Sequence, residues 1–233
     1  MGNSLSGKIT LVVDGTSYVG KGIVRAFLEE DATVVVPASS VSDIDGLKRA
    51  LQSVARGKLV TFLTDIADYA KVKDYADMLY NQFKRIDLAV TYINASRNTR
   101  SFLKTDIEEW QTMGNSLTAY FAASRALFTL MQDPGSMYIT MSNADHLAPK
   151  PHASLHRLAS LFQMEIAGLF AREKHQIKTR YHHLYIENII APVMVGQFII
   201  KLYCGQAAEP GKIFQCCITK TFHNEIIQAI LKD

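Results

Sequence analysis

KITLVVDGTSYVGKGIVRAFLEE, residues Lys8–Glu30, contains the patterns of a strand, a glycine loop and a helix in direct succession. The run Ile9–Val13 is apolar, rich in β-branched residues and short, which predicts a buried strand. Apolar residues then recur at helical spacing, so we expect a helix to begin near Gly20. This arrangement presents backbone N–H groups and a helix N-terminus to a pyrophosphate, so the stretch indicates a nucleotide-binding loop.

The glycine loop departs from a dinucleotide fingerprint. We expect Gly15 to allow a sharp turn and Gly20 to let the helix lie close to the sheet. The fingerprint has a middle glycine where the backbone approaches the phosphates, whereas the nearest residues here are Tyr18 and Val19. A tyrosine at that point either stacks over the nucleotide site or fills it. Many strand-to-helix turns with two glycines bind nothing, so the loop alone leaves nucleotide binding open.

The composition fits one globular α/β domain. The 233 residues are 48% hydrophobic and 20% charged, which is enough for a full core. The formal net charge is +3 without a Lys/Arg run, which argues against a nucleic-acid partner. Cys204, Cys216 and Cys217 lack metal-ligand spacing, so we expect no metal site and a reduced, cytoplasmic protein. No apolar run is long enough to span a membrane, and no secretory signal is visible.

The first six residues match a lipidation pattern. MGNSLS would expose Gly2 after removal of Met1, with Ser6 at the position that N-myristoylation requires. An ordinary polar lead into the first strand explains the same residues. A single myristoyl chain anchors a protein only marginally, so a peripheral membrane location depends on modification of Gly2.

Strand and helix patterns alternate along the rest of the chain. Further buried strands are predicted at 32–36, 58–63, 86–93, 136–141, 184–191 and 212–218, and helices at 43–54, 72–83, 108–131, 154–174 and 193–203. Continuous apolar strands separated by helices predict a parallel sheet covered on both faces. We therefore expect a single doubly wound, Rossmann-like α/β domain over residues 1–233, with about seven strands.

With its strands in this order, the chain resembles the short-chain dehydrogenase/reductase family over nearly its whole length. Asp65 follows the third strand, Arg85–Asp87 leads into the fourth, Asn94–Ser96 follows the fourth, and Ser142 follows the apolar run of the fifth. The resemblance implies that NAD or NADP is the cofactor and that Ser142 is the catalytic serine. The cofactor-binding residues that it implies are Gly15, Tyr18, Gly20, Asp65 and Asn94.

The other catalytic residues of that family are replaced. The family uses a Tyr as acid/base and a Lys one helical turn later, which lowers the pKa of the Tyr and holds the ribose. Counting from Ser142 places Leu155 at the Tyr position and Ala159 at the Lys position. Leucine cannot donate a proton, and loss of a general acid/base costs on the order of 10²–10⁴ in rate. The family's supporting Asn aligns near Asn115 or Ser116. In this setting Ser142 is also explained as a residue that caps its own strand.

Three groups are candidates for the missing acid. Histidine is a residue type that can act as an acid near neutral pH, but His156 lies one helical step, about 100°, from Leu155, so we expect its side chain to point elsewhere. His152 precedes the same helix and has no evident orienting partner. Tyr69 and Lys73 reproduce Tyr-x-x-x-Lys upstream of Ser142, where packing explains the tyrosine better.

Two further departures concern the substrate and the ribose. The family inserts a mobile segment that closes over substrate, whereas here Pro192 leads directly into the apolar stretch Val193–Ile200. The lid, and the water exclusion that it provides, are therefore expected to be missing. The second strand ends at Pro37–Ser40, without the acidic residue that binds the ribose of NAD or the basic residue that favours NADP.

Two hypotheses follow. The first is a catalytically degenerate member of the family with a binding, scaffolding or regulatory role, a protein partner and residual NAD(P) binding. The second is an active NAD(P)-dependent oxidoreductase that acts on a carbonyl or alcohol through a non-family acid such as His156. The two long helices form the dimer interface in the family, so a homo-oligomer is expected. Core burial explains part of the wide apolar arc of the second helix, which comprises Leu161, Phe162, Met164, Ile166, Leu169 and Phe170.

Overall fold

Seven parallel strands form one sheet in the order β3-β2-β1-β4-β5-β6-β7, and helices cover both faces. The computed structural model describes residues 4–64, 69–93, 101–143, 154–173, 176, 178–186, 191–205 and 215–218. The strands are β1 (Ile9–Val13), β2 (Thr33–Ala38), β3 (Lys58–Leu63), β4 (Leu88–Tyr92), β5 (Met137–Asn143), β6 (Arg180–Ile186) and β7 (Gln215–Ile218). The helices are α1 (Tyr18–Glu29), α2 (Val41–Ala50), α3 (Tyr69–Phe83), α4 (Ile107–Leu130), α5 (Ser154–Arg172) and α6 (Pro192–Cys204), with a 3₁₀ turn at Phe102–Lys104. The predicted doubly wound parallel sheet is confirmed.

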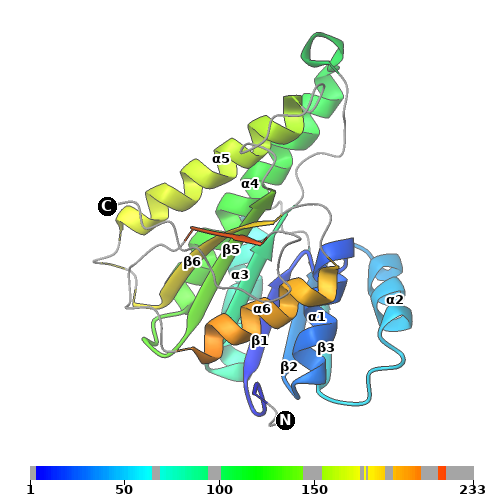
Figure 1. The fold of residues 1–233 in the computed structure, drawn as a ribbon, viewed down its shortest axis with the longest axis vertical. Coiled ribbons are helices and arrows are strands. Elements are labelled where there is room, and N and C mark those ends of the chain that lie inside the picture. The colour runs from blue at the N-terminus through cyan, green and yellow to red at the C-terminus, as the bar shows by residue number, and fades with distance from the viewer. Residues whose placement is uncertain are drawn as a thin grey trace.

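The two faces of the sheet carry separate cores. Side chains of α1, α2 and α6 pack on one face, and those of α3, α4 and α5 pack on the other. Figure 1 shows α1 and α6 in front of the sheet and the long helices α4 and α5 running past its upper edge. Close packing of α1 on α6 requires glycine, because a Cβ on Gly22 would lie 2.2 Å from the Cβ of Pro192. No helix in the described part of the chain is both long and apolar enough to cross a bilayer.

Strand β2 continues through Pro37, although the sequence predicts its end there. The carbonyl of Ala38 accepts a hydrogen bond from the Thr64 amide at 2.9 Å, so Ala38 faces β3 and Pro37 faces β1. Pairing of β1 with β2 ends at Leu11 and Val35. The missing N–H of Pro37 therefore interrupts no ladder hydrogen bond, and the strand can include it.

Strand β6 begins at Arg180, four residues before the predicted start at Leu184. Its first half contains His182 and His183, which hide the apolar pattern, yet both histidines are buried. Strand β5 also extends further than expected, to Asn143, so Ser142 lies within the strand. Helix α6 begins at Pro192 itself, which confirms that the chain enters a helix directly at the place where the family inserts its lid.

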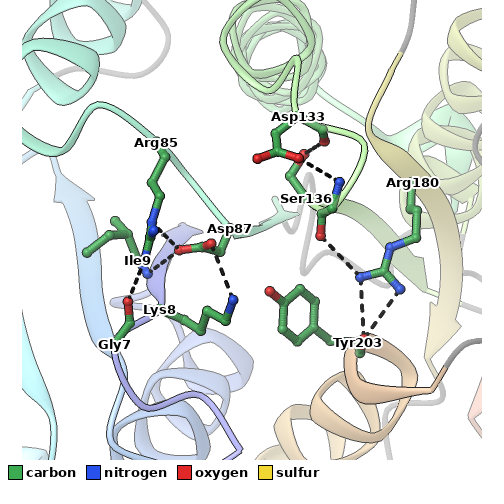
Figure 2. Close-up of polar contacts among 10 residues, drawn as sticks. Gly7, Lys8, Ile9, Arg85, Asp87, Asp133, Ser136, Arg180 and Tyr203 are labelled. Carbon is green, nitrogen blue, oxygen red and sulfur yellow. Dashed lines mark hydrogen bonds and ion pairs between the residues drawn. The ribbon is translucent and has the colours of Figure 1, made fainter.

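Figure 2 shows polar contacts at the amino ends of the strands, the end opposite to the carboxyl ends where the predicted site lies. The Asp87 carboxylate accepts a hydrogen bond from the Ile9 amide at 2.8 Å and pairs with Arg85 Nε at 3.2 Å and Lys8 Nζ at 3.7 Å. Arg180 donates to the carbonyl of Tyr203 at the end of α6. The motif Arg85–Asp87 therefore joins β1 to β4, which is a structural role.

Candidate functional site

The strand order reverses between β1 and β4, and ligands of doubly wound sheets bind at the carboxyl ends of the strands on either side of that point. The loop after β1, the last residue of β4 (Tyr92) and the end of β5 (Ser142 and Asn143) lie at this edge. Asp65 and Asn94, the other predicted cofactor residues, lie outside the described residues.

The turn after β1 runs from Asp14 to Ser17, whose amide donates to the Asp14 carbonyl at 3.1 Å, so Gly15 lies within it. Asp14 has a φ of 60°, in the left-handed region that favours glycine. Gly15 is needed for space, since a Cβ there would lie 2.8 Å from Cγ1 of Val36. Gly20 is needed for the same reason, because its Cβ would lie 2.2 Å from the carbonyl oxygen of Asp14. Both glycines thus hold the start of α1 tightly against the loop.

Helix α1 begins at Tyr18, two residues before the predicted start at Gly20. The Ser17 hydroxyl caps it, accepting a hydrogen bond from the Gly20 amide at 3.1 Å and donating to the Asp14 carbonyl at 2.8 Å. The amides of Tyr18 and Val19 are in the first helical turn, where N–H groups lack intrahelical partners. The Tyr18 side chain is 71% exposed, so it does not fill the loop. Tyr18 thus leaves the N-terminus of α1 uncovered by its own side chain.

The end of β2 carries no group that selects between NAD and NADP. The hydroxyl of Ser40 accepts a hydrogen bond from the Asp43 amide at 3.1 Å and donates to the Asp43 carboxylate at 2.6 Å. It therefore caps α2, which begins at Val41, two residues before the predicted start at 43. Ser39 is exposed.

Ser142 is fully buried and bonded within the sheet. Its hydroxyl lies 3.1 Å from Nε2 of His183, whose Nδ1 lies 2.9 Å from the hydroxyl of Thr140. The Thr140 hydroxyl in turn lies 2.7 Å from that of Tyr181. These four side chains form a buried chain of hydrogen bonds on the face of the sheet that α4 and α5 cover. Burial and internal bonding fit the interpretation of Ser142 as a structural residue.

Apolar side chains surround Leu155 and Ala159, the positions that counting from Ser142 assigns to the family's Tyr and Lys. Leu155 and Ala159 are 3% and 2% exposed, and they form a small core cluster with Met113. Leu117 and Leu158 pack against this cluster from its edge. Neither position presents a polar group to the carboxyl edge of the sheet.

His156 faces the end of β5, and the expectation that it points elsewhere was wrong. The amide nitrogen of Asn143 lies 2.8 Å from Nε2 of His156, and the hydroxyl of Tyr92 donates to the amide oxygen of Asn143 at 3.0 Å. Because Tyr92 donates to that oxygen, the Asn143 nitrogen is the atom that faces His156 and donates to it. This network assigns the proton of a neutral His156 to Nδ1.

Asn143 and His156 have the same spacing in the sequence as Ser142 and Leu155, one residue later. The sequence contains this second pair at the right spacing, but the family has a serine at the first position, and Asn143 is not a serine. Asn143 and His156 thus contact each other as the family's Ser and Tyr are expected to do. Ser160 then stands one turn beyond His156, where the family has its Lys, and its hydroxyl donates to the His156 carbonyl at 3.0 Å.

The remaining candidates are exposed, bonded elsewhere or outside the described residues. Asn115 is exposed, and the hydroxyl of Ser116 donates to the Thr112 carbonyl at 3.0 Å. Lys73 is exposed on α3, while His152 and the side chain of Tyr69 lie outside the described residues. Within the described ranges, no group of His, Cys, Asp and Glu side chains could hold a metal ion.

The comparison with known families agrees with the fold. The model of the short chain dehydrogenase family matches residues 8–154, which is more than half of the chain. The chain belongs to the short-chain dehydrogenase/reductase family. A 3-oxoacyl-[acyl-carrier-protein] reductase of Thermotoga maritima is 24% identical over 111 residues, which are 48% of this chain and 44% of that protein. A 3alpha-hydroxysteroid dehydrogenase of Mediterraneibacter gnavus is 26% identical over 133 residues, 56% of this chain and 53% of its own length. The alignments with these two relatives thus span about half of their length.

Solved structures of short-chain dehydrogenases/reductases have the same fold. One from Serratia marcescens has a TM-score of 0.76 at 17% identity, over 92% of this chain and 98% of its own. A metagenomic short-chain oxidoreductase in complex with NADP has a TM-score of 0.71 at 17% identity, over 87% of this chain and 92% of its own. At this identity the likeness concerns the fold.

Proposed function

We propose that this protein is a catalytically degenerate short-chain dehydrogenase/reductase that binds a dinucleotide weakly and acts through binding, as a scaffold or regulator. The observation that carries the proposal is that the family's cation is replaced: the contact of Asn143 with His156 puts Ser160 at the Lys position, one helical turn beyond His156. A hydride-transferring site of this family needs both a proton donor and that cation. Counting from Ser142 instead gives Leu155 and Ala159, which pack against Met113 and supply neither.

The described residues fit the pyrophosphate of NAD or NADP in part. The amides of Tyr18 and Val19 at the start of α1 would hold the phosphates, and Gly20 keeps that end of the helix close to the loop. The nicotinamide, when bound, would supply the hydride in an active family member. Asp14 opposes binding, because its carboxylate sits in the loop that receives an anion.

The contact between Asn143 and His156 favours a second candidate, an oxidoreductase with His156 as its acid. The imidazole stands at the carboxyl edge of the sheet, next to the last residue of β5. In the assigned tautomer, however, its Nε2 accepts a hydrogen bond and has no proton to donate. A reductase step would need His156 to be protonated, and thus the Asn143 amide to turn over.

Titration of the purified protein with NADPH and NADH, followed by fluorescence, tests the proposal. A generic dicarbonyl and a quinone serve as substrates in the same samples, and the variant His156→Ala is the matched control. Binding without turnover is the expected result. Turnover that disappears in His156→Ala would establish the second candidate instead, whereas absence of binding to either nucleotide would leave an interaction module without a cofactor.

We also propose a homodimer formed through α4 and α5. Phe121 and Phe162 are each 44% exposed and Leu169 is 57% exposed, so these helices carry large apolar side chains outside the core. The ring of Phe121 stacks on that of Phe170 with centroids 5.8 Å apart, which continues the exposed face into the core. Further proposals are a cytoplasmic location and myristoylation of Gly2, which lies outside the described residues. Mass spectrometry of the native protein tests the modification.

A further inference from the structure

Gln163 on α5 is a polar side chain inside the core, and its partner is a backbone carbonyl at the end of β4. The side chain is 3% exposed, and its Nε2 donates a hydrogen bond to the carbonyl oxygen of Ile93 at 2.7 Å. In the described residues, the pairing of β4 with β1 ends at Thr91 and its pairing with β5 ends at Tyr92. The Ile93 carbonyl lies beyond both ladders, so Gln163 supplies a donor that no neighbouring strand supplies there.

Gln163 and His156 lie on one face of α5, because seven residues, about two helical turns, separate them. His156 contacts Asn143 at the end of β5, and Asn143 accepts a hydrogen bond from the hydroxyl of Tyr92. Tyr92 directly precedes Ile93, which Gln163 holds. These hydrogen bonds therefore form a closed network that runs from α5 to the end of β5, on to the end of β4, and back to α5.

The network passes around the carboxyl edge of the sheet. Tyr92 packs in the core that α1, α2 and α6 cover, whereas Ile93 packs in the core that α3, α4 and α5 cover. Because neighbouring residues at a strand end point to opposite faces, a rotation that displaces one of them displaces the other. Loss of the Tyr92 hydroxyl from the Asn143 oxygen would free the Asn143 amide to turn over. The hydrogen bond from Gln163 opposes that rotation.

We propose that Gln163 is a positioning residue for the carboxyl edge of the sheet. By holding the end of β4 it keeps the Tyr92 hydroxyl on Asn143, and it thereby fixes which nitrogen of His156 accepts a hydrogen bond. The inference deepens the proposed function and rests on it only where nucleotide affinity is concerned. Dinucleotides lie across the point where the strand order reverses. One half of NADPH would therefore lie over β4 and β5 at this edge, whereas ADP would lie on the side of β2 and β3.

The tautomer of His156 tests the inference without a nucleotide. Nitrogen-15 chemical shifts of the imidazole at pH 8.5, above the usual range of histidine titration, measure the ratio of the Nδ1–H form to the Nε2–H form. Gln163→Met keeps the size of the side chain and removes the donor. It should lower this ratio at least about five-fold, the equivalent of about 1 kcal/mol.

Gln132→Met is the matched control for this measurement. Nε2 of Gln132 also donates to a backbone carbonyl, that of Phe128 at 2.6 Å, but it does so just beyond the C-terminus of α4. Gln132→Met should leave the tautomer ratio of His156 equal to that of the wild type.

A double-mutant comparison shows whether Gln163 acts through Tyr92. Tyr92→Phe removes the hydroxyl that orients Asn143, so it should lower the tautomer ratio as Gln163→Met does. In the Tyr92→Phe background, Gln163→Met should have no further effect on the ratio. A merely structural role would lower the free energy of unfolding and leave the ratio unchanged in either background. If Gln163→Met fails to fold, Gln163→Asn, whose amide is one methylene shorter, provides the same comparison.

Binding of NADPH and of ADP, measured by calorimetry, separates this inference from the proposed function. Gln163→Met should weaken NADPH binding about five-fold and leave the ADP affinity unchanged. A wild type that binds neither nucleotide would contradict the proposed nucleotide binding, and the tautomer ratio would still decide the role of Gln163. The inference is overturned if the ratio is the same in Gln163→Met as in the wild type, if the effects of the two substitutions add, or if NADPH and ADP bind and are weakened alike.

Discussion

The side-chain amide nitrogen of Asn143 lies 2.8 Å from Nε2 of His156, and this contact joins the end of β5 to α5. Leu155, the preceding residue, is buried against Met113 instead. One step along α5 thus separates a side chain that faces the carboxyl edge of the sheet from one that faces the core. This difference in side-chain direction determines which positions of α5 could carry the family's acid/base chemistry.

We predict that the double variant L155Y/A159K loses stability and gains no activity. It would bury a phenol and an ammonium in the cluster formed with Met113, at positions only 3% and 2% exposed. Burial of an unpaired charge makes a loss of about 3 kcal/mol or more in the free energy of unfolding the expected result. Urea unfolding followed by circular dichroism measures this loss.

The matched variant H156Y/S160K should behave differently. Its tyrosine would take the place of an imidazole that already contacts Asn143, whereas Ser160 is only 2% exposed, so the lysine of this variant is expected to cost stability much as that of A159K does. NADPH-dependent reduction of a dicarbonyl should rise at least about ten-fold over the wild type, the lower part of the range for general acid catalysis. Equal absence of activity in the two variants would show that the contact does not mark the functional face.

The sequence predicts the fold of this protein better than its site. The strand at 58–63 matches β3 residue by residue, because its apolar run is uninterrupted. The start of β6 was missed because Arg180, His182 and His183 break the apolar pattern, and only the structure shows the histidines buried between neighbouring strands and helices. Local sequence cannot reveal burial that tertiary packing imposes.

The error at His156 has a different cause. Neighbouring residues of a strand point to opposite faces, so assigning the catalytic serine position to Ser142 or to Asn143 changes every residue counted from it. Sequence favoured Ser142 by its side-chain type. The structure shows Ser142 bonded to His183 within the sheet and Asn143 bonded to His156 at its edge.

Asp14 provides a test of nucleotide binding. We expect Asp14→Asn to tighten NADPH binding about five-fold at low ionic strength, because it removes a negative charge from the loop that would receive the pyrophosphate. Asparagine tolerates the left-handed backbone of Asp14, whose φ is 60°, so stability should change by less than about 1 kcal/mol. Fluorescence titration at two salt concentrations is the measurement, and the gain should shrink at high salt.

Asp31 supplies the control for this prediction. It also has a positive φ, 67°, but it follows the opposite end of α1. Asp31→Asn should leave the NADPH affinity unchanged. An affinity that is the same in Asp14→Asn as in the wild type would indicate that the loop does not hold the phosphates.

His182 should make the stability depend on pH in the acidic range. Burial, together with the charge of Arg180, lowers the pKa of His182 to about 4 from its usual 6.5. Between these values the unfolded chain binds a proton that the folded chain does not, so stability falls as the pH decreases from 6.5 to 4. The slope is about 1.4 kcal/mol per pH unit for one group, about 3 kcal/mol in total.

Comparison of the wild type with His182→Leu isolates this contribution. Urea unfolding between pH 7 and pH 4.5 should show a shallower pH dependence in the variant, even if its stability at pH 7 is lower. Carboxylates titrate equally in both proteins and cancel in the difference. The same slope in both would mean that His182 is protonated alike in the folded and unfolded chains.

A final prediction concerns the proposed dimer. Leu169→Glu places a charge on the outer face of α5, at a side chain that is 57% exposed, so the free energy of unfolding of the monomer should change by about 0.5 kcal/mol or less. In a dimer through α4 and α5 the same carboxylate would be desolvated, and the dimer dissociation constant should rise more than about ten-fold. Tyr80→Glu on α3, where Tyr80 is 51% exposed, is the control and should leave association unchanged. Analytical ultracentrifugation over a range of concentrations measures both, and a wild type that sediments as a monomer at micromolar concentration would remove the dimer.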